Sequence, residues 1–328
     1  MHIEAMGVSL LSNDLVNAPE RLEAKLAKIE ELGFRSVEIP IQGLNVIVNG
    51  RLLEARLERY VKLFRQFSLR VTTHAPFEIN LFRQEGLSKE RQVLQASIEV
   101  SGALGATAMA YHPARYVGEE ELLYRHEWRP YAAETEERLL EQEREELRLA
   151  GDLARMRGVR IGMENMRPYL DCPYYCYAVR PTRLAEQMLR IGHGSIGLTL
   201  DTGHLLLAAR MYGFDPLEEL AAMAPHVFHL HVHDNFGKPN FSLEKNQYDL
   251  IPHGRGDMHM PIGEGEVPFR EIAAALAPHF RGTFVHELRE AYEPAWAELI
   301  GRTASLLPQG SVLGAGVRAH ADAEGAGL

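Results

Sequence analysis

The chain has 328 residues, with 35 Lys and Arg against 45 Asp and Glu, which gives a formal net charge of −10. Such an acidic chain lacks the basic surface of a general nucleic-acid binder. The two cysteines exclude a disulfide scaffold. No secretory signal and no long apolar segment is visible, so we expect a cytoplasmic protein without a membrane partner.

Short apolar runs alternate with amphipathic stretches along the whole chain. The runs predict strands at 3–9, 35–40, 69–74, 106–112, 159–164, 196–201, 227–231 and 282–287. The stretches between them predict helices at 18–33, 51–67, 88–104, 133–157, 182–191, 204–212, 216–223, 268–276 and 292–307. Strands that alternate with helices at this spacing form a parallel sheet.

Eight strand–helix units predict the α/β class and a single closed (β/α)8 barrel of the TIM type over residues 1–308, with an open doubly wound sheet as the alternative. The Gly- and Ala-rich segment 309–328 predicts a disordered tail. The connections 113–132 and 235–263 are long and irregular, and such loops are usually functional.

Six consecutive predicted strands end in a side chain that can bind a metal. In chain order these residues are His74, His112, Glu164, Asp201, His231 and Glu287. The carboxyl ends of barrel strands meet at one rim, where such proteins place their chemistry. Buried carboxylates repel one another unless a cation or shared protons offset their charge, so this pattern predicts a metal site. A single histidine or carboxylate at a strand end would be explained as an ordinary hydrogen-bonded polar residue.

Two further clusters extend the predicted site. His204 follows Asp201 in the segment DTGH, and Asp257 and His259 form a D-x-H pair inside the second long loop. These residues would hold a second metal or contact the substrate; a flexible polar loop is the alternative for the D-x-H pair. Oxygen and imidazole ligands suit Mn, Mg, Co or Zn. The chain has no Gly-x-Gly-x-x-Gly after a strand and no P-loop, so no nucleotide cofactor is expected.

The order of these segments resembles the xylose isomerase-like superfamily of TIM barrels, which includes sugar phosphate isomerases and epimerases and endonuclease IV. The matching segments are THAPFEINL, YHP, GMEN, LDTGH, HLHVHDN, DMHMPIGEGEV and VHEL. The resemblance implies that Glu164, Asp201, His231 and Glu287 hold one metal, as in ketose 3-epimerases. With His74, His112, His204, Asp257 and His259 added, the set also resembles the three-metal site of endonuclease IV.

The charges of the long loops favour a small molecule over DNA. Three arginines stand against five glutamates in residues 113–134, and Lys238, Lys245 and Arg255 stand against Glu244 and Asp249 in residues 235–256. Neither loop is a basic track for phosphates. The preferred hypothesis is therefore a metal-dependent isomerase or epimerase of a sugar or related polyhydroxy carbonyl compound. An endonuclease IV-type phosphodiesterase acting on abasic DNA is the alternative, and a non-enzymatic binding barrel is a third.

In the preferred hypothesis a metal-stabilised enediolate forms when a proton leaves the substrate. The resemblance implies that Glu164 and Glu287 exchange this proton, one as base and one as acid. Arg255 or Lys238 would hold a terminal phosphate or carboxylate, with solvated loop charge as the alternative. A lyase or dehydratase would need the same proton abstraction. The sequence leaves the oligomeric state open, and loop 113–132 would be either a lid or a contact in a homo-oligomer.

Overall fold

The computed structural model describes residues 1–328 except 13–14, 16–18, 245–246 and 315–328. Within the described residues, eight parallel strands form a barrel that closes because the last strand pairs with the first. Their order around the barrel is the chain order: β1 (His2–Ser9), β2 (Ser36–Pro40), β5 (Arg70–His74), β6 (Ala108–Tyr111), β7 (Arg160–Glu164), β8 (Ile196–Asp201), β9 (Val227–Val232) and β10 (Arg281–His286). The predicted (β/α)8 barrel is confirmed.

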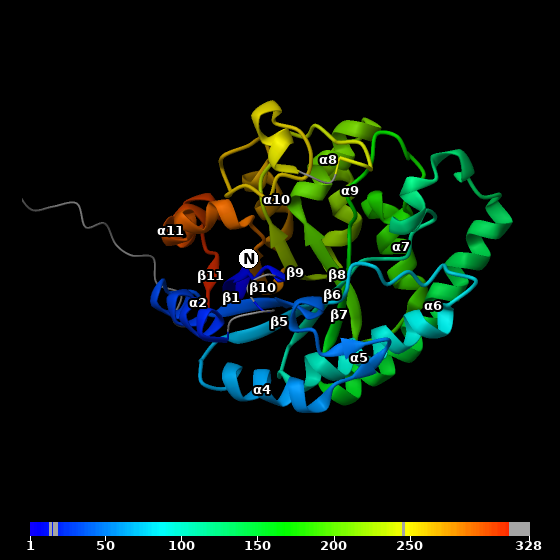
Figure 1. The fold of residues 1–328 in the computed structure, drawn as a ribbon. Helices are drawn as coiled ribbons and strands as arrows, with labels where there is room; N and C mark the ends of the chain where they lie inside the picture. The colour runs from blue at the N-terminus through cyan, green and yellow to red at the C-terminus, as the bar shows by residue number, and fades with distance from the viewer. Residues whose placement is uncertain (13–14, 16–18, 245–246, 315–328) are drawn as a thin grey trace, which may run out of the picture.

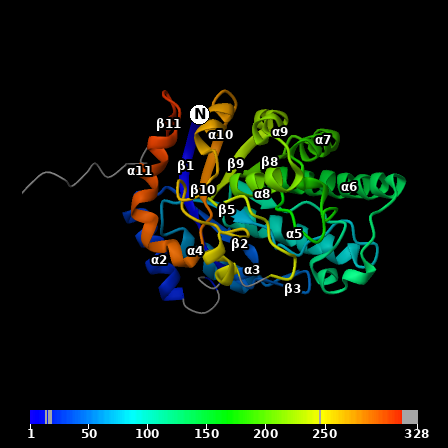
Figure 2. The ribbon, with the colours of Figure 1, turned by 90° about the horizontal axis from the view of Figure 1, so that it is seen from above.

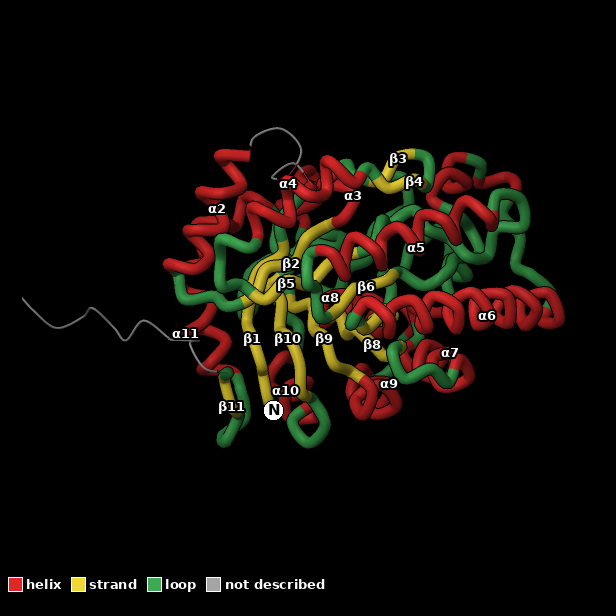
Figure 3. The backbone as a smooth tube through the Cα atoms, turned by 90° about the horizontal axis from the view of Figure 1, so that it is seen from below, coloured by secondary structure: helices red, strands yellow, loops and turns green. Residues whose placement is uncertain are grey.

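The helices lie around the outside of the strands (Figures 1 and 3). They are α2 (Pro19–Glu31), α3 (Ile41–Leu44), α4 (Glu54–Phe64), α5 (Leu87–Ala103), α6 (Ala133–Arg157), α7 (Pro181–Ile191), α8 (Thr202–Tyr212), α9 (Pro216–Met223), α10 (Phe269–Leu276) and α11 (Trp296–Leu306). Closure brings α2 and α11 side by side (Figures 1 and 2). Lys25 and Lys28 of α2 form ion pairs with Glu293, just before α11.

The strands are buried on both faces. Every residue of β2, β8 and β9 is buried, because these strands are covered on both faces. Their ionisable residues are buried as well: Glu38, Asp201, His229 and His231 are all 0% exposed. Each of them needs a partner inside the barrel, because an unpaired buried polar group is costly.

Three local features differ from the sequence-based predictions. Arg51–Leu52, predicted as the start of a helix, is strand β4 and pairs with β3 (Ile47–Val48) in a two-stranded antiparallel sheet. Both segments have only two residues, too few for a recognisable period. The predicted final helix begins as a 3-10 helix, Glu290–Ala295, which contains Pro294. The long connections also contain 3-10 helices at Glu119–Leu123, Arg125–Glu127 and Gln247–His253.

The expectation of disorder from residue 309 does not hold for β11 (Val312–Leu313), which pairs in parallel with the start of β1 (Figure 3). Pairing of β1 with β2 begins only at Gly7, so the staggered strands leave His2 and Ile3 an unpaired edge that β11 covers. The rest of the predicted tail, 315–328, lies outside the described residues. Among the helices that are described, none combines the length and apolarity needed to cross a membrane.

Candidate metal centre

The six predicted strand-end residues meet at one rim of the barrel. Glu164 and Asp201 are the last residues of β7 and β8, and His231 lies near the end of β9. Glu287 directly follows β10, and its backbone N–H donates to the carbonyl of Val232. Ligand atoms of these four residues all lie within 4.8 Å of one another. His74 and His112 join the group through Glu164, whose Oε2 lies 3.4 Å and 3.5 Å from their Nε2 atoms.

Local structure orients Asp201. β8 runs directly into α8, and Asp201 is the N-cap of this helix, with its Oδ1 accepting the backbone N–H of His204. The side chain of Asn165 fixes the backbone here: it accepts from the N–H of Asp201 and donates to its carbonyl. One turn of helix therefore brings Asp201 and His204 to the same rim.

The tautomers of three histidines are set by backbone carbonyls. Nδ1 of His74, His204 and His259 lies within hydrogen-bond distance of the carbonyls of Ala75, Asn165 and Glu287, respectively. Because a carbonyl can only accept a hydrogen bond, Nδ1 must carry the proton in each of these rings. In the neutral ring the opposite nitrogen, Nε2, then holds a lone pair. Each of these lone pairs faces a carboxylate oxygen, at 3.4, 3.2 and 3.0 Å respectively.

A lone pair facing a carboxylate is repulsive unless an extra proton or a cation lies between them. Glu164 Oε2, His231 Nδ1 and Asp257 Oδ1 are also buried without a hydrogen-bond partner in the described structure. Unpaired oxygen and nitrogen atoms that converge in this way fit a divalent cation. The residues present thus suit the metal centre predicted from the sequence.

The pKa shifts in the cluster also favour a site for positive charge. Burial alone would raise the pKa of Glu164, but the imidazoles of His231 and His112 hold this pKa well below its ordinary value. Burial would lower the pKa of His204, but Asp201 and Asp257 raise it to about 10. Without a metal, protons on the imidazoles supply the positive charge that the carboxylates require.

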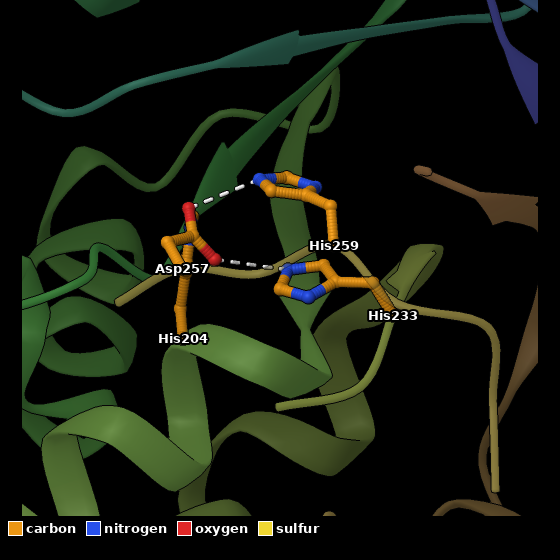
Figure 4. A group of neighbouring side chains, drawn as sticks. All are labelled: His204, His233, Asp257 and His259. Atoms are coloured by element: carbon orange, nitrogen blue, oxygen red, sulfur yellow. Dashed lines mark hydrogen bonds and ion pairs between the residues drawn. The ribbon is translucent and has the colours of Figure 1, made fainter. Parts of the chain in front are cut away.

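A second cluster lies beside the first. His204, His233, Asp257 and His259 also place one ligand atom each within 4.8 Å of one another. Figure 4 shows Asp257 beside the stacked rings of His259 and His233: its oxygens lie 3.0 Å from Nε2 of His259 and 3.5 Å from Nε2 of His233. His233 Nε2 also lies 3.0 Å from Asp201 Oδ2, so this ring connects the two clusters.

His233 was missed by the sequence analysis. Its ring packs against the first turn of α8, where a Cβ added at Gly203 would lie only 2.0 Å from His233 Cε1. The signal was present in the segment HLHVHDN, where three histidines alternate with other residues. Alternation on β9 places His229 and His231 on the interior face of the barrel, and His233 follows one residue after the end of the strand.

Two cavities open onto the cluster, with volumes of about 290 and 210 Å³. Phe77, Arg167, His259 and Glu287 border both. The larger cavity is bordered by hydroxyl and amide side chains, including Ser9, Ser12, Asn240 and Ser242, and the smaller one by His112, Arg115, Glu164 and His204. The side chain of Glu287 is 19% exposed, whereas that of Glu164 is 1% exposed, so the cluster is reached from the side of Glu287.

The loop cations predicted to hold an anionic group border neither cavity. Lys238 is exposed, and Arg255 forms an ion pair with Glu244. Arg115, Arg167 and Arg289 border the cavities instead. The Arg167 guanidinium donates to Asp257 Oδ2 at 3.2 Å and to the Tyr169 hydroxyl at 3.3 Å. No period or motif in the sequence separates these arginines from the others.

Fold and site together define a (β/α)8 barrel with a cluster of metal-ligating side chains at its carboxyl rim. A family model described as xylose isomerase-like TIM barrel matches residues 26–307, and the chain belongs to this family. The predicted resemblance is therefore confirmed. The sequence has no significant match among curated proteins.

Solved structures with the same fold include a D-tagatose 3-epimerase-like protein, with 19% identity, a TM-score of 0.66 and coverage of 92% of this chain and 98% of that one. A xylose isomerase-like TIM barrel protein from Mycobacterium smegmatis in complex with magnesium has 18% identity, a TM-score of 0.63 and coverage of 92% and 96%. The IOLI protein with a bound zinc atom has 17% identity, a TM-score of 0.64 and coverage of 92% and 98%.

Proposed function

We propose that the protein is a divalent-metal-dependent isomerase or epimerase of a sugar or related polyhydroxy carbonyl compound. The observation that carries the proposal is the cluster of Glu164, Asp201, His231 and Glu287, in which two glutamates belong to one ligand set beside a cavity. Similar folds include structures described as D-psicose 3-epimerase and L-ribulose 3-epimerase, which supports a sugar substrate.

Glu164, Asp201, His231 and Glu287 would hold the catalytic ion, which is Mn, Mg, Co or Zn. When bound, this ion would polarise a carbonyl and stabilise the negative charge that develops as a proton leaves the neighbouring carbon. Structures of similar fold contain magnesium or zinc, which supports a divalent ion. His204, Asp257 and His259, with His233, would hold a second ion if one is present.

Glu164 and Glu287 would move the proton. Both border the 210 Å³ cavity, and His231 Nδ1 lies 3.3 Å from Glu164 Oε1 and 3.6 Å from Glu287 Oε2. One carboxylate would take the proton from the substrate and the other would return one at the opposite side, which is the acid–base pair that epimerisation requires.

Residues around the cavities would hold the sugar. Phe77 borders both cavities and stacks on His112, with ring centroids 5.3 Å apart and an interplanar angle of 20°. Its ring would cover an apolar face of the substrate, while Ser9, Ser12 and Asn240 would bind hydroxyl groups.

Solvent exchange tests the proposal. The protein loaded with Mn²⁺ is incubated in D₂O with D-tagatose, D-fructose and D-psicose, and deuterium at the carbon beside the carbonyl is measured. We expect incorporation that EDTA abolishes and that Glu164→Gln removes. If the metal-loaded protein incorporates no deuterium into any of these ketoses, it does not act on simple ketoses.

The second candidate is a metal-dependent phosphodiesterase that cleaves abasic DNA. It is favoured by the second cluster, since three groups of ligands, including His74 with His112 and Glu164, would suit several ions. Nicking of a duplex with one abasic site is the test. Cleavage that Glu287→Gln abolishes would favour this function over the isomerase.

A further inference from the structure

A wholly buried carboxylate lies beneath the metal centre. Glu38 is the middle residue of β2 and is 0% exposed. Its Oε1 lies 2.8 Å from Nε2 of His231, and its Oε2 lies 2.7 Å from Nε2 of His229. The hydroxyl of Thr72 donates to Oε2 at 3.2 Å. Three neighbouring groups thus converge on one carboxylate in the interior of the barrel.

A charge at this depth is costly unless it is fully paired. Two imidazole nitrogens and one hydroxyl lie within hydrogen-bond distance of the Glu38 carboxyl group. This set of partners suits an ionised carboxylate, which acts only as an acceptor. His229 and the Thr72 hydroxyl hydrogen-bond its Oε2, while its Oε1 has the 2.8 Å ion-pair contact with Nε2 of His231.

This acceptor decides which nitrogen of His231 faces the rim. Because Glu38 only accepts, Nε2 of His231 must carry a proton, and the lone pair of the neutral ring is left on Nδ1. Nδ1 is the atom that lies 3.3 Å from Glu164 Oε1 and 3.6 Å from Glu287 Oε2. Backbone carbonyls select the opposite tautomer in His74, His204 and His259, with the proton on Nδ1, whereas in His231 a carboxylate selects the proton on Nε2.

We propose that Glu38 is a positioning residue that fixes the tautomer and orientation of His231 and strengthens His231 as a metal ligand. A carboxylate behind a ligating imidazole raises the basicity of the ring. His229 holds the other oxygen of Glu38, so the carboxylate cannot turn away from His231. The inference rests on the metal site of the proposed function, but it concerns metal affinity and needs no substrate.

The test is the dissociation constant for Mn²⁺ of the full chain with Glu38→Gln, measured by titration against a chelating dye. The matched control is Glu143→Gln. Glu143 is also 0% exposed and accepts hydrogen bonds from Ala114, Tyr111, Tyr177 and Gln187, but it borders neither cavity. Thermal unfolding of each variant monitors the fold.

We expect Glu38→Gln to weaken Mn²⁺ binding by about 10- to 100-fold, the range for residues that support a metal ligand. Glu143→Gln should stay within about threefold of wild type by the same reasoning, because it supports no ligand. Equal Mn²⁺ affinity in wild type and Glu38→Gln overturns the inference and leaves the metal site intact. Equal losses in the two variants also overturn it, because they indicate a general structural effect.

A wild-type protein that binds no divalent metal would overturn both the inference and the proposed function. If Glu38→Gln does not fold, a crystal structure of the wild type with Mn²⁺ decides. His231 should contact the ion through Nδ1 and keep Nε2 within hydrogen-bond distance of Glu38. Contact through Nε2 would overturn the inference.

Discussion

His231 Nδ1 lies 3.3 Å from Glu164 Oε1, which joins the ends of β9 and β7 across β8. Both side chains are almost fully buried. Glu164 also faces His74, His112 and His204, at 3.4 to 3.6 Å. Glu164 therefore contacts more of the rim residues than any single histidine does. We expect its substitution to have the largest effect on metal affinity and on proton exchange.

Glu164→Gln removes one negative charge from this point. We expect the affinity for Mn²⁺ to fall by at least about 100-fold, more than for a supporting residue, and proton exchange to fall by about 10²- to 10⁴-fold. Calorimetric titration measures the first effect and deuterium incorporation the second. Glu271→Gln, at an exposed position on α10, should change neither. Full exchange in Glu164→Gln would show that Glu164 is not the base.

Phe77→Ala should separate substrate binding from metal binding. The ring is 43% exposed, borders both cavities, meets the ring of His74 edge to face and stacks on that of His112. Loss of an aromatic contact worth about 0.5–1.5 kcal/mol, together with the buried area of the ring, should lower kcat/KM about tenfold. Mn²⁺ affinity should not change. Phe241→Ala, 41% exposed and bordering neither cavity, is the control; equal losses in both variants would argue against a specific contact.

Gly203→Ala tests the second cluster. The added methyl group would collide with the His233 ring, so we expect this ring to move, with a loss of about 1–3 kcal/mol in the free energy of unfolding. Any ion held by His204, His233, Asp257 and His259 should be lost, whereas the ion at Glu164 should remain. Elemental analysis measures the metal content per chain. Gly301→Ala, where an added Cβ meets nothing within 4 Å, is the control. If wild type holds more than one ion per chain and Gly203→Ala holds the same number, His233 is not a metal ligand.

The buried carboxyl group of Glu143 should make the free energy of unfolding depend on pH. Burial raises the pKa of this carboxyl, and four donors only partly offset burial. The folded state therefore binds the proton more tightly than the unfolded state. The stabilisation from Glu143 is present below the ordinary pKa and is lost as pH rises through the raised value, by at most about 1.4 kcal/mol per pH unit. Urea unfolding of wild type and Glu143→Gln across pH 4 to 8 should show a flatter profile in the variant; parallel profiles would contradict the raised pKa.

The sequence predicted the strand-end residues of the site better than the residues from loops and strand interiors. His74, Glu164 and Asp201 could be placed because each ends a buried apolar run, and barrel topology brings such ends together. Glu38 and His229 lie within strands, and they pair across the interior of the barrel. Their pairing depends on which strands face each other, and the spacing of apolar residues in the sequence does not show this. The arginines at the cavities depend on loop conformation in the same way.

The proposed function is tested most directly by deuterium incorporation into a ketose by Mn²⁺-loaded wild-type protein in D₂O, followed by NMR, with and without EDTA. We predict incorporation at the carbon next to the carbonyl, its loss with EDTA and its loss in Glu164→Gln. Cleavage of abasic DNA without incorporation into any ketose, by protein that holds its metal, would contradict the proposed function.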